Sequence, residues 1–183
     1  IDAFPICLDT KDTEEIIKTI VNIAPAFGGI NLEDISAPRC FEIEERLKEL
    51  LDIPVFHDDQ HGTAIVVLAG IINALKVTGK QKDSCKVVVN GAGSAGIAIT
   101  KLLLTYGFSH ITMCDINGIL SKNSPNLNYM QKYMTEVTNL EEKEGTLADA
   151  LCGADIFIGV SAPNIVTEDM VASMNKDAIL FAM

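Results

Sequence analysis

The sequence predicts an α/β fold in which a doubly wound parallel sheet follows the end of another α/β domain. From residue 85 onward, short runs of valine, isoleucine and phenylalanine alternate with helix-length segments. Such continuous apolar runs are typical of parallel strands that helices cover on both faces. A glycine-rich turn, NGAGSAG, joins the first of these strands to an apolar helix. The earlier residues contain helical and extended segments of their own, so we divide the chain into domains at residues 1–60 and 61–183.

The first part of the chain is expected to contain two helices and an extended segment. Asp12 followed by Glu15 resembles a capping box, and apolar residues then recur at helical spacing, which predicts a helix over about 12–24. A second helix opens at the segment SAPRC, and its charged residues, Glu44 among them, are expected to face water. The segment IPVFHDD is expected to be extended. The core-facing residues of the second helix are expected to be Phe41, Ile43, Leu47, Leu50 and Leu51.

The second part of the chain begins with a long apolar helix, expected from Gly62 to about Val77. The pattern then predicts four strands, at residues 85–90, 110–114, 155–160 and 178–183. It predicts helices at residues 94–106, 146–153 and 167–174, and a polar stretch, NGILSKNSPNLN, that leads into a further helix-like piece. Because a helix-length segment separates each strand from the next, the strands are expected to run parallel.

The charge balance excludes two classes of partner. The chain has 14 basic and 25 acidic residues, which gives a net charge of −11. A negative charge of this size repels nucleic acids and anionic membranes, so we expect neither as a partner. The longest apolar run, AIVVLAGII, is about half as long as a membrane-spanning helix, so no membrane segment is expected.

The five cysteines are scattered and form no C-x-x-C pair. Their odd number and wide spacing favour reduced thiols, so we expect a cytoplasmic protein. The chain opens on IDAFPICLDT, without an initiator methionine or a signal-like region, and closes inside the apolar run AILFAM. We therefore expect it to be a fragment of a longer protein.

The strongest single motif is VVVNGAGSAG, in which a buried strand runs directly into three glycines. Gly91 permits a tight turn, Gly93 lets the backbone approach a pyrophosphate, and Gly96 lets helix and strand pack closely. Asp115 ends the next strand, about 20 positions further on, where it would accept hydrogen bonds from an adenosine ribose. The alternative is a tight turn beside an unrelated surface aspartate. The predicted pyrophosphate-binding residues are Gly91, Ala92, Gly93, Ser94, Ala95 and Gly96.

The position of Asp115 favours NAD over NADP as the cofactor. Its carboxylate would accept from both ribose hydroxyls and would repel a 2′-phosphate. Lys122 lies nearby in the sequence and could move to pair with a phosphate, so NADP remains an alternative.

The segment FHDDQHGTA resembles the H-E-x-x-H helix of zinc proteases at first sight. In such a protease both histidines share one face of a continuous helix and a glutamate lies between them. Here Pro54 precedes His57 in an extended segment, Gly62 follows His61 as a helix start, and the acid is aspartate. These departures argue against a zinc protease.

The carboxylates make a better metal site than the histidines. Glu33 and Asp34 are adjacent after a glycine pair, and both can reach one ion only where the backbone bends, as at the end of a strand. Together with Asp59 they would form an all-oxygen site suited to Mg²⁺ or Mn²⁺. The alternative is that these acidic pairs lie on a solvated surface.

Two segments resemble signatures of the malic enzyme family. The run FHDDQHGTAIVVLAGII is similar to the family's F-x-D-D-x-x-G-T-A motif before an apolar helix, and FGGINLEDI resembles its preceding Glu-Asp metal segment. Both come before NGAGSAG, in the family's order, and the similarity to the smaller bacterial-type enzymes runs through the whole chain. The resemblance implies oxidative decarboxylation of malate to pyruvate and CO₂, with NAD or NADP, a divalent metal, and assembly as a homo-oligomer, a dimer or tetramer.

The resemblance also implies roles for single residues. Glu33, Asp34 and Asp59 would be the metal ligands, and Asp58 would support the catalytic amine. The segment GVSAPN would line the nicotinamide side, with Ser161 and Asn164 as its polar residues. The two histidines of FHDDQHGTA would then have structural or ligand-supporting roles.

The family's catalytic set is incomplete in this chain. The lysine base and tyrosine acid of the family precede IDAFP, and its substrate-holding asparagines follow FAM, so the chain alone is expected to be inactive. Two other classes remain open. One is a dinucleotide-binding or metal-binding module without turnover. The other is an amino-acid dehydrogenase-like protein, which does not require LEDI together with HDD.

Overall fold

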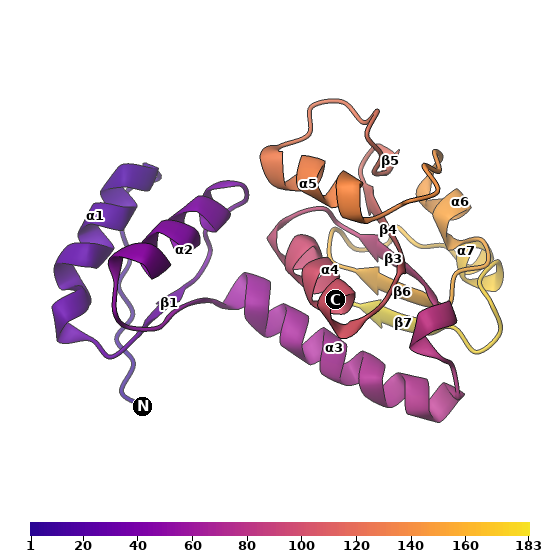
Figure 1. Ribbon diagram of the computed structural model, residues 1–183, viewed down its shortest axis with the longest axis horizontal. Coiled ribbons are helices and arrows are strands. Elements are labelled where there is room, and N and C mark those ends of the chain that lie inside the picture. The colour runs from indigo at the N-terminus through magenta and orange to yellow at the C-terminus, as the bar shows by residue number, and fades with distance from the viewer. The chain divides into compact units, whose positions relative to one another are not determined.

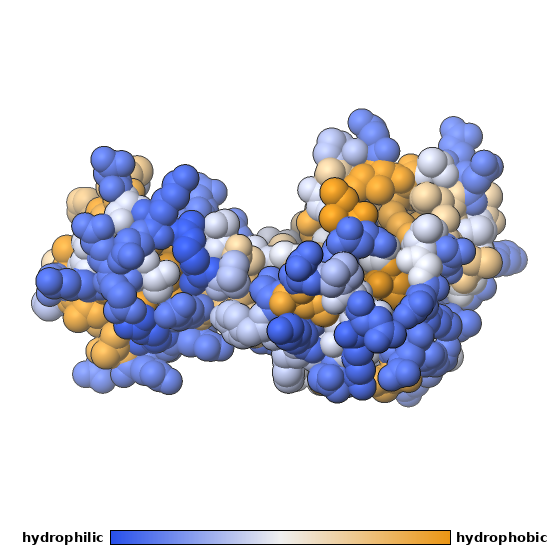
Figure 2. Space-filling model, turned by 90° about the horizontal axis from the view of Figure 1, so that it is seen from above, coloured by the Kyte–Doolittle hydropathy of each residue, from blue (hydrophilic) through white to orange (hydrophobic).

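The computed structural model describes residues 1–183 and divides into two compact units, Ile1–Asp58 and Asp59–Met183 (Figure 1). The division falls close to the predicted boundary at Gln60. In the view of Figure 2, hydrophilic side chains cover much of the visible surface of each unit, while hydrophobic ones gather in separate patches. Each unit has a hydrophobic core of its own.

The first unit consists of two helices and a small parallel sheet. Its elements are α1 (Thr13–Ile23), a 3₁₀ turn (Ala24–Ala26), β1 (Ile30–Leu32), α2 (Arg39–Leu50) and β2 (Val55–His57). The two strands pair in parallel, with Leu32 opposite His57. Isoleucines of α1 and Ile43 and Leu47 of α2 pack with Leu32 and Val55 in one buried cluster. The sheet therefore has its own core, and both of its carboxyl ends lie at one edge.

The predicted capping box of α1 is half correct. Asp12 Oδ1 accepts a hydrogen bond from the Glu15 N–H at 2.9 Å, as expected of an N-cap. The Glu15 carboxylate accepts from the Thr10 hydroxyl, however, and the Asp12 N–H donates to Thr10 Oγ1. Thr10 thus stands between the two residues that a capping box would join directly.

Two expected positions on α2 are wrong. Glu44 is buried, and its carboxylate pairs with Lys48 Nζ one turn later at 2.6 Å. Glu44 lies within the stripe that Cys40, Ile43 and Leu47 bury, so periodicity places it against the core despite its charge. Leu50 is exposed because it is the last residue of the helix.

Helix α3 (Asp58–Thr78) begins four residues before the predicted start at Gly62. Two aspartates occupy its first turn, where the positive end of the helix dipole stabilises carboxylates. By length and composition alone α3 could cross a membrane. A Cβ on Gly70 would lie 2.6 Å from the Phe181 ring, so α3 packs on the sheet there, although only 17% of its apolar stretch is buried. The absence of a membrane segment stays a prediction.

The second unit is built on a five-stranded sheet with the order β5-β4-β3-β6-β7. The strands β3 (Lys86–Asn90), β4 (His110–Asp115), β6 (Ile156–Gly159) and β7 (Ile179–Ala182) are parallel. The predicted doubly wound parallel sheet is therefore confirmed. The short strand β5 (Gly118–Ile119) pairs antiparallel with the end of β4 and was not expected. The connection from β4 to β6 crosses β3, so the chain changes direction between β3 and β6.

Helices cover both faces of this sheet (Figure 1). On one face, Val88 and Phe157 pack with side chains of α6 (Leu147–Leu151) and α7 (Glu168–Ala172). Side chains alternate along a strand, so Val89, with Ile158 and Phe181 beside it in register, faces the other way. That face meets α3 through Phe181, and α4 (Ser94–Tyr106) follows β3.

A partly buried ion pair closes the amino-terminal edge of the sheet. Lys80 Nζ lies 2.8 Å from Asp155 Oδ1, and Asn175 Nδ2 donates to the same oxygen at 3.0 Å. The Lys86 N–H donates to Asp155 Oδ2 at 3.0 Å. Burial raises the pKa of Asp155, but the bonds from Lys80, the Lys86 amide and Asn175 outweigh burial, so its pKa is lowered.

Replacing Asp155 with alanine is expected to lower the free energy of unfolding by about 3 kcal/mol, because Lys80 is left partly buried without its partner. A lowered pKa in the folded state stabilises the fold above the unfolded pKa of about 4, and this stabilisation is lost as the pH falls through the folded value. Urea titrations at pH 7 and at pH 3 measure both effects. A difference between Asp155→Ala and the parent protein that is as large at pH 3 as at pH 7 contradicts this account.

Candidate functional site

The glycine-rich turn between β3 and α4 has no room for side chains at two of its three glycines. Gly91 has a φ of +122°, and a Cβ there would lie 2.5 Å from the Val160 carbonyl oxygen. A Cβ on Gly96 would lie 1.7 Å from the Gly91 carbonyl oxygen. The first glycine thus serves the turn and the third serves the close packing of helix on strand, as the motif predicts.

Gly93 is different, because it is exposed and a Cβ there would meet no atom within 4 Å. Its φ of −94° is open to any residue, so neither packing nor backbone conformation requires a glycine. Gly93 is the N-cap of α4 and has no side chain that could accept a hydrogen bond. The N–H groups of Ser94 and Ala95, in the first turn, therefore receive no side-chain cap. Open space before an uncapped helix start fits a pyrophosphate.

The turn lies where the chain changes direction, between the carboxyl ends of β3 and β6. In doubly wound sheets, ligands bind at this position. Asn90 Nδ2, at the end of β3, donates to Ser161 Oγ at 2.9 Å, so a buried amide holds the second residue after β6 and thereby its loop. Asn164 is exposed in the same loop and has a φ of +60°. Ser161 and Asn164 therefore lie on the loop beside the glycine turn.

Asp115 ends β4 and forms the turn that leads to β5. Its Oδ1 accepts from the Asn117 N–H at 2.7 Å, which fixes the carboxylate, and its Oδ2 has no partner in the protein. The side chain is half-buried and can accept a further hydrogen bond. Burial, followed by the charge of Asp115, raises the pKa of the neighbouring Cys114 thiol to about 12. Cys114 is therefore not a thiolate nucleophile at neutral pH.

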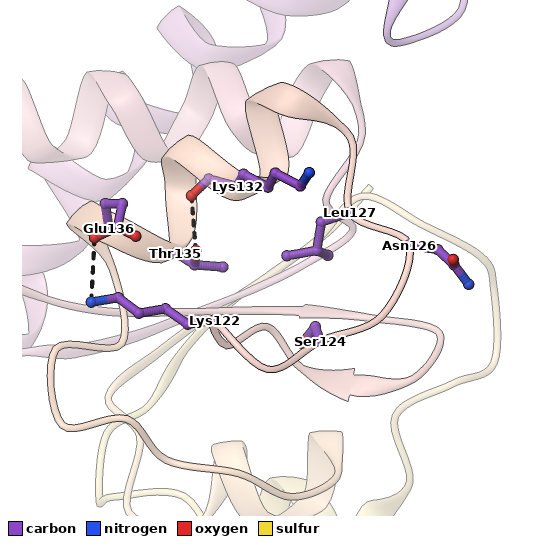
Figure 3. A pocket seen from close by; sticks show the side chains of 7 residues that line it. All are labelled: Lys122, Ser124, Asn126, Leu127, Lys132, Thr135 and Glu136. Carbon is purple, nitrogen blue, oxygen red and sulfur yellow. Dashed lines mark hydrogen bonds and ion pairs between the residues drawn. The ribbon is translucent and has the colours of Figure 1, made fainter.

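A polar pocket of about 330 Å³ lies between the loop after β5 and helix α5 (Tyr129–Val137) (Figure 3). Lys122 and Glu136 point toward one another there, with Lys122 Nζ 3.3 Å from the carboxylate. Glu142 lies 3.8 Å from the same ammonium group. Two carboxylates thus compensate the charge of Lys122, although all three groups are exposed and each pair contributes little energy.

The candidate metal ligands follow the two strands of the first unit. Glu33 comes directly after β1, and Asp58 directly after β2, and the residues before them are opposite each other in the parallel register. Asp34 has a φ of +56°, so the chain bends there, as sharing one ion with Glu33 requires. Asp59 follows in the first turn of α3. The structure nevertheless gathers no three histidine, cysteine or acidic side chains into a metal-binding group.

The two histidines of FHDDQHGTA lie on different elements. His57 is the last residue of β2 and is fully buried, whereas His61 is in the first turns of α3. They do not share one helix, which is the arrangement that a zinc protease needs.

Sequence reasoning missed two residues that touch the predicted loops. Gln131 Nε2 donates to the Ala92 carbonyl oxygen at 3.1 Å, and Asn90 holds Ser161 as described. Asn90 had a signal, because a polar residue ends an apolar strand just before the glycines. Gln131 had none, because its partner lies far away along the chain.

Family models match both parts of the chain. A model described as "Malic enzyme, NAD binding domain" matches residues 60–183, and one described as "Malic enzyme, N-terminal domain" matches residues 5–48. The resemblance inferred from the motifs is thereby confirmed.

Similar proteins are named malic enzymes of both cofactor types. The chain is 59% identical to the NAD-dependent malic enzyme of Geobacillus stearothermophilus and 46% identical to the NADP-dependent malic enzyme of Rhizobium meliloti. All of this chain is covered in each case, but only 38% and 24% of those proteins. A crystal structure of the NAD-dependent malic enzyme of Thermotoga maritima matches with a TM-score of 0.97 and 49% identity, over 100% of this chain and 49% of that one. On this agreement of family model, relatives and fold, the chain belongs to the malic enzyme family.

Proposed function

We propose that the protein containing this chain oxidatively decarboxylates malate to pyruvate and CO₂ while it reduces NAD or NADP. The observation that carries the proposal is the turn Gly91–Gly96, which opens an uncapped helix at the point where the sheet changes direction, in a chain of this family. Since the chain spans less than half the length of the relatives described above, the activity is proposed for the complete protein.

The chain's own residues would bind and orient the dinucleotide. The N–H groups at Gly93 and in the first turn of α4 would hold the pyrophosphate, since the backbone approaches open space there. Asp115 Oδ2 would accept from the adenosine ribose. Ser161 and Asn164 would lie on the nicotinamide side, with Asn90 fixing Ser161. The bound nicotinamide supplies the hydride acceptor.

Glu33, Asp34 and Asp59 are proposed as ligands of Mg²⁺ or Mn²⁺. Carboxylate oxygens are the donors that these hard cations prefer, and the bend at Asp34 supports the assignment. A bound cation supplies a Lewis acid for the hydroxyl and carboxylate oxygens of malate. Asp58 is proposed to support the catalytic amine. In this proposal residues 1–60 end the substrate and metal domain, and residues 61–183 belong to the cofactor domain.

The test is malate-dependent reduction of NAD by the complete protein, followed at 340 nm in the presence of Mn²⁺ and again after EDTA. Reduction that needs malate and is lost with EDTA supports the proposal. Dinucleotide binding without turnover points to the non-catalytic module. Reduction driven by an amino acid instead of malate points to the dehydrogenase alternative.

NAD is expected to bind at least about tenfold more tightly than NADP, because Asp115 would repel a 2′-phosphate. Lys122 is already paired with Glu136 and Glu142, and these exposed pairs, each of little energy, would be given up if Lys122 paired with a phosphate. Titration calorimetry with each cofactor measures the ratio of the two dissociation constants. Tighter binding of NADP overturns the assignment.

Two further expectations concern the complete protein. We propose a homo-oligomer, a dimer or tetramer, and sedimentation velocity would measure it. We also propose a cytoplasmic location, which is supported by five free cysteines, none of them in a disulfide.

A further inference from the structure

We propose that Gln131 is a positioning residue that sets the glycine-rich turn for the dinucleotide's pyrophosphate. The inference rests on the proposed dinucleotide function and assigns to it a residue outside the glycine motif. Gln131 lies in the first turn of α5. In the sequence, strands β4 and β5 lie between this helix and the glycine-rich turn. Helices α4 and α5 contact each other, which brings the two segments together (Figure 1).

The side-chain amide of Gln131 is held at both of its ends. Its Oε1 accepts from the Asn128 N–H at 3.0 Å, while Asn128 Oδ1 accepts from the Gln131 N–H at 2.9 Å. This reciprocal pair is the capping box of α5. Its Nε2 donates to the Ala92 carbonyl oxygen at 3.1 Å. Because the cap fixes the oxygen end of the amide, the nitrogen end is aimed at Ala92.

The carbonyl of Ala92 belongs to the same peptide unit as the N–H of Gly93. The only cis peptide bond in the structure is Ala37–Pro38, so the Ala92–Gly93 bond is trans, and its C=O and N–H point in opposite directions. A carbonyl bound to α5 therefore turns the Gly93 N–H away from α5. That N–H has no acceptor within the protein, and a Cβ on Gly93 would meet only open space. Gln131 thus fixes the peptide whose N–H is offered to a ligand.

The choice of glutamine at position 131 distinguishes a positioning role from a role in helix capping alone. A capping box needs only an acceptor at this place, and glutamate supplies one as well as glutamine does. Glutamate has no hydrogen to donate, so it would set a carboxylate beside the Ala92 carbonyl oxygen and near the phosphates. Only the amide serves both the cap and the turn.

The experiment compares Gln131→Met with Thr138→Val in the complete protein. Methionine keeps the length and neutrality of the side chain but removes both hydrogen bonds. Thr138 Oγ1 donates to the Met134 carbonyl oxygen at 2.7 Å at the far end of the same helix, so Thr138→Val loses one bond of α5 without touching the turn. Gln131→Met is expected to weaken the binding of NAD and of ADP-ribose by the same factor, about tenfold, and to leave the binding of adenosine unchanged. Thr138→Val is expected to bind NAD within about twofold of the parent.

A second variant, Gln131→Glu, separates stability from affinity. It keeps the cap, so its melting temperature is expected to stay near that of the parent, while NAD binds at least about tenfold more weakly. Equal NAD affinity in the parent and both Gln131 variants overturns the inference and leaves dinucleotide binding intact. Loss of affinity in Thr138→Val as large as in Gln131→Met also overturns it, since helix stability is then the cause. If the parent binds neither NAD nor NADP, both the inference and the proposed function fail.

Discussion

Gly96→Ala is expected to destabilise the second unit by at least about 4 kcal/mol, because the new Cβ would lie 1.7 Å from the Gly91 carbonyl oxygen. The clash is with backbone atoms at a junction where strand, turn and helix meet, so no side-chain rotation relieves it. Gly93→Ala is expected to cost no more than about 1 kcal/mol, since its site is open and its φ is ordinary, and only the poorer N-cap propensity of alanine opposes it. The same substitution is therefore expected to cost far more stability at Gly96 than at Gly93, three residues away.

The affinity for NAD is expected to show what stability does not, namely why a glycine stands at position 93. Gly93→Ala folds but places a methyl group in the space proposed for the pyrophosphate, so NAD should bind at least about tenfold more weakly. Chemical denaturation measures stability, and calorimetry with NAD measures affinity. A Gly93→Ala protein that binds NAD as the parent does would show that no ligand approaches this backbone.

Asp59→Asn is expected to lower malate oxidation by at least about 100-fold in the complete protein, because it removes a charged ligand from the proposed metal site. Mg²⁺ or Mn²⁺ should raise the melting temperature of the parent protein by mass action, and Asp59→Asn should abolish that rise. NAD binding should persist, because backbone amides at Gly91–Gly96 and a helix N-terminus hold the pyrophosphate. Thermal melts with and without metal, together with initial rates, measure these effects.

His61→Ala is the control for the metal prediction. It should keep the stabilisation by Mn²⁺, and Zn²⁺ should show no special preference for the parent protein. Loss of metal binding in His61→Ala, with retention in Asp59→Asn, would assign the site to the histidines and contradict the carboxylate proposal.

Much of the second unit was predictable because its strands are continuous apolar runs and its helices are bounded by clear signals. The helix Ser94–Tyr106 has the predicted limits, since glycines precede it and Gly107 follows in a left-handed conformation. Strand β5 was missed because two residues, Gly118 and Ile119, are too few to show a period. The start of α3 was misplaced because the aspartates after His57 were assigned to the extended segment, whereas they occupy the first helical turn.

The candidate site was predictable where a motif is local and was not where a contact joins distant segments. The roles of Gly91 and Gly96 follow from their spacing in the motif. The structure adds which atoms a Cβ at each position would clash with. The contact of Gln131 with Ala92 depends on how α5 lies against α4, which no local pattern encodes. The proposed metal ligands were predictable only in part. The bend at Asp34 was expected from the two adjacent acidic residues and is present, whereas the gathering of the three ligands around one ion stays a prediction.

The turn at Asp115 limits how the cofactor preference could be redesigned. Its carboxylate has two tasks, since one oxygen fixes the hairpin through the Asn117 N–H while the other has no partner in the protein and is proposed to accept from the ribose. An engineer who removes the negative charge with alanine to admit NADP also removes the acceptor that shapes the hairpin. Serine or asparagine keeps an acceptor for that N–H, so these are the first replacements to try. A library that randomises this position alone should therefore yield NADP-accepting proteins mainly with those two residues.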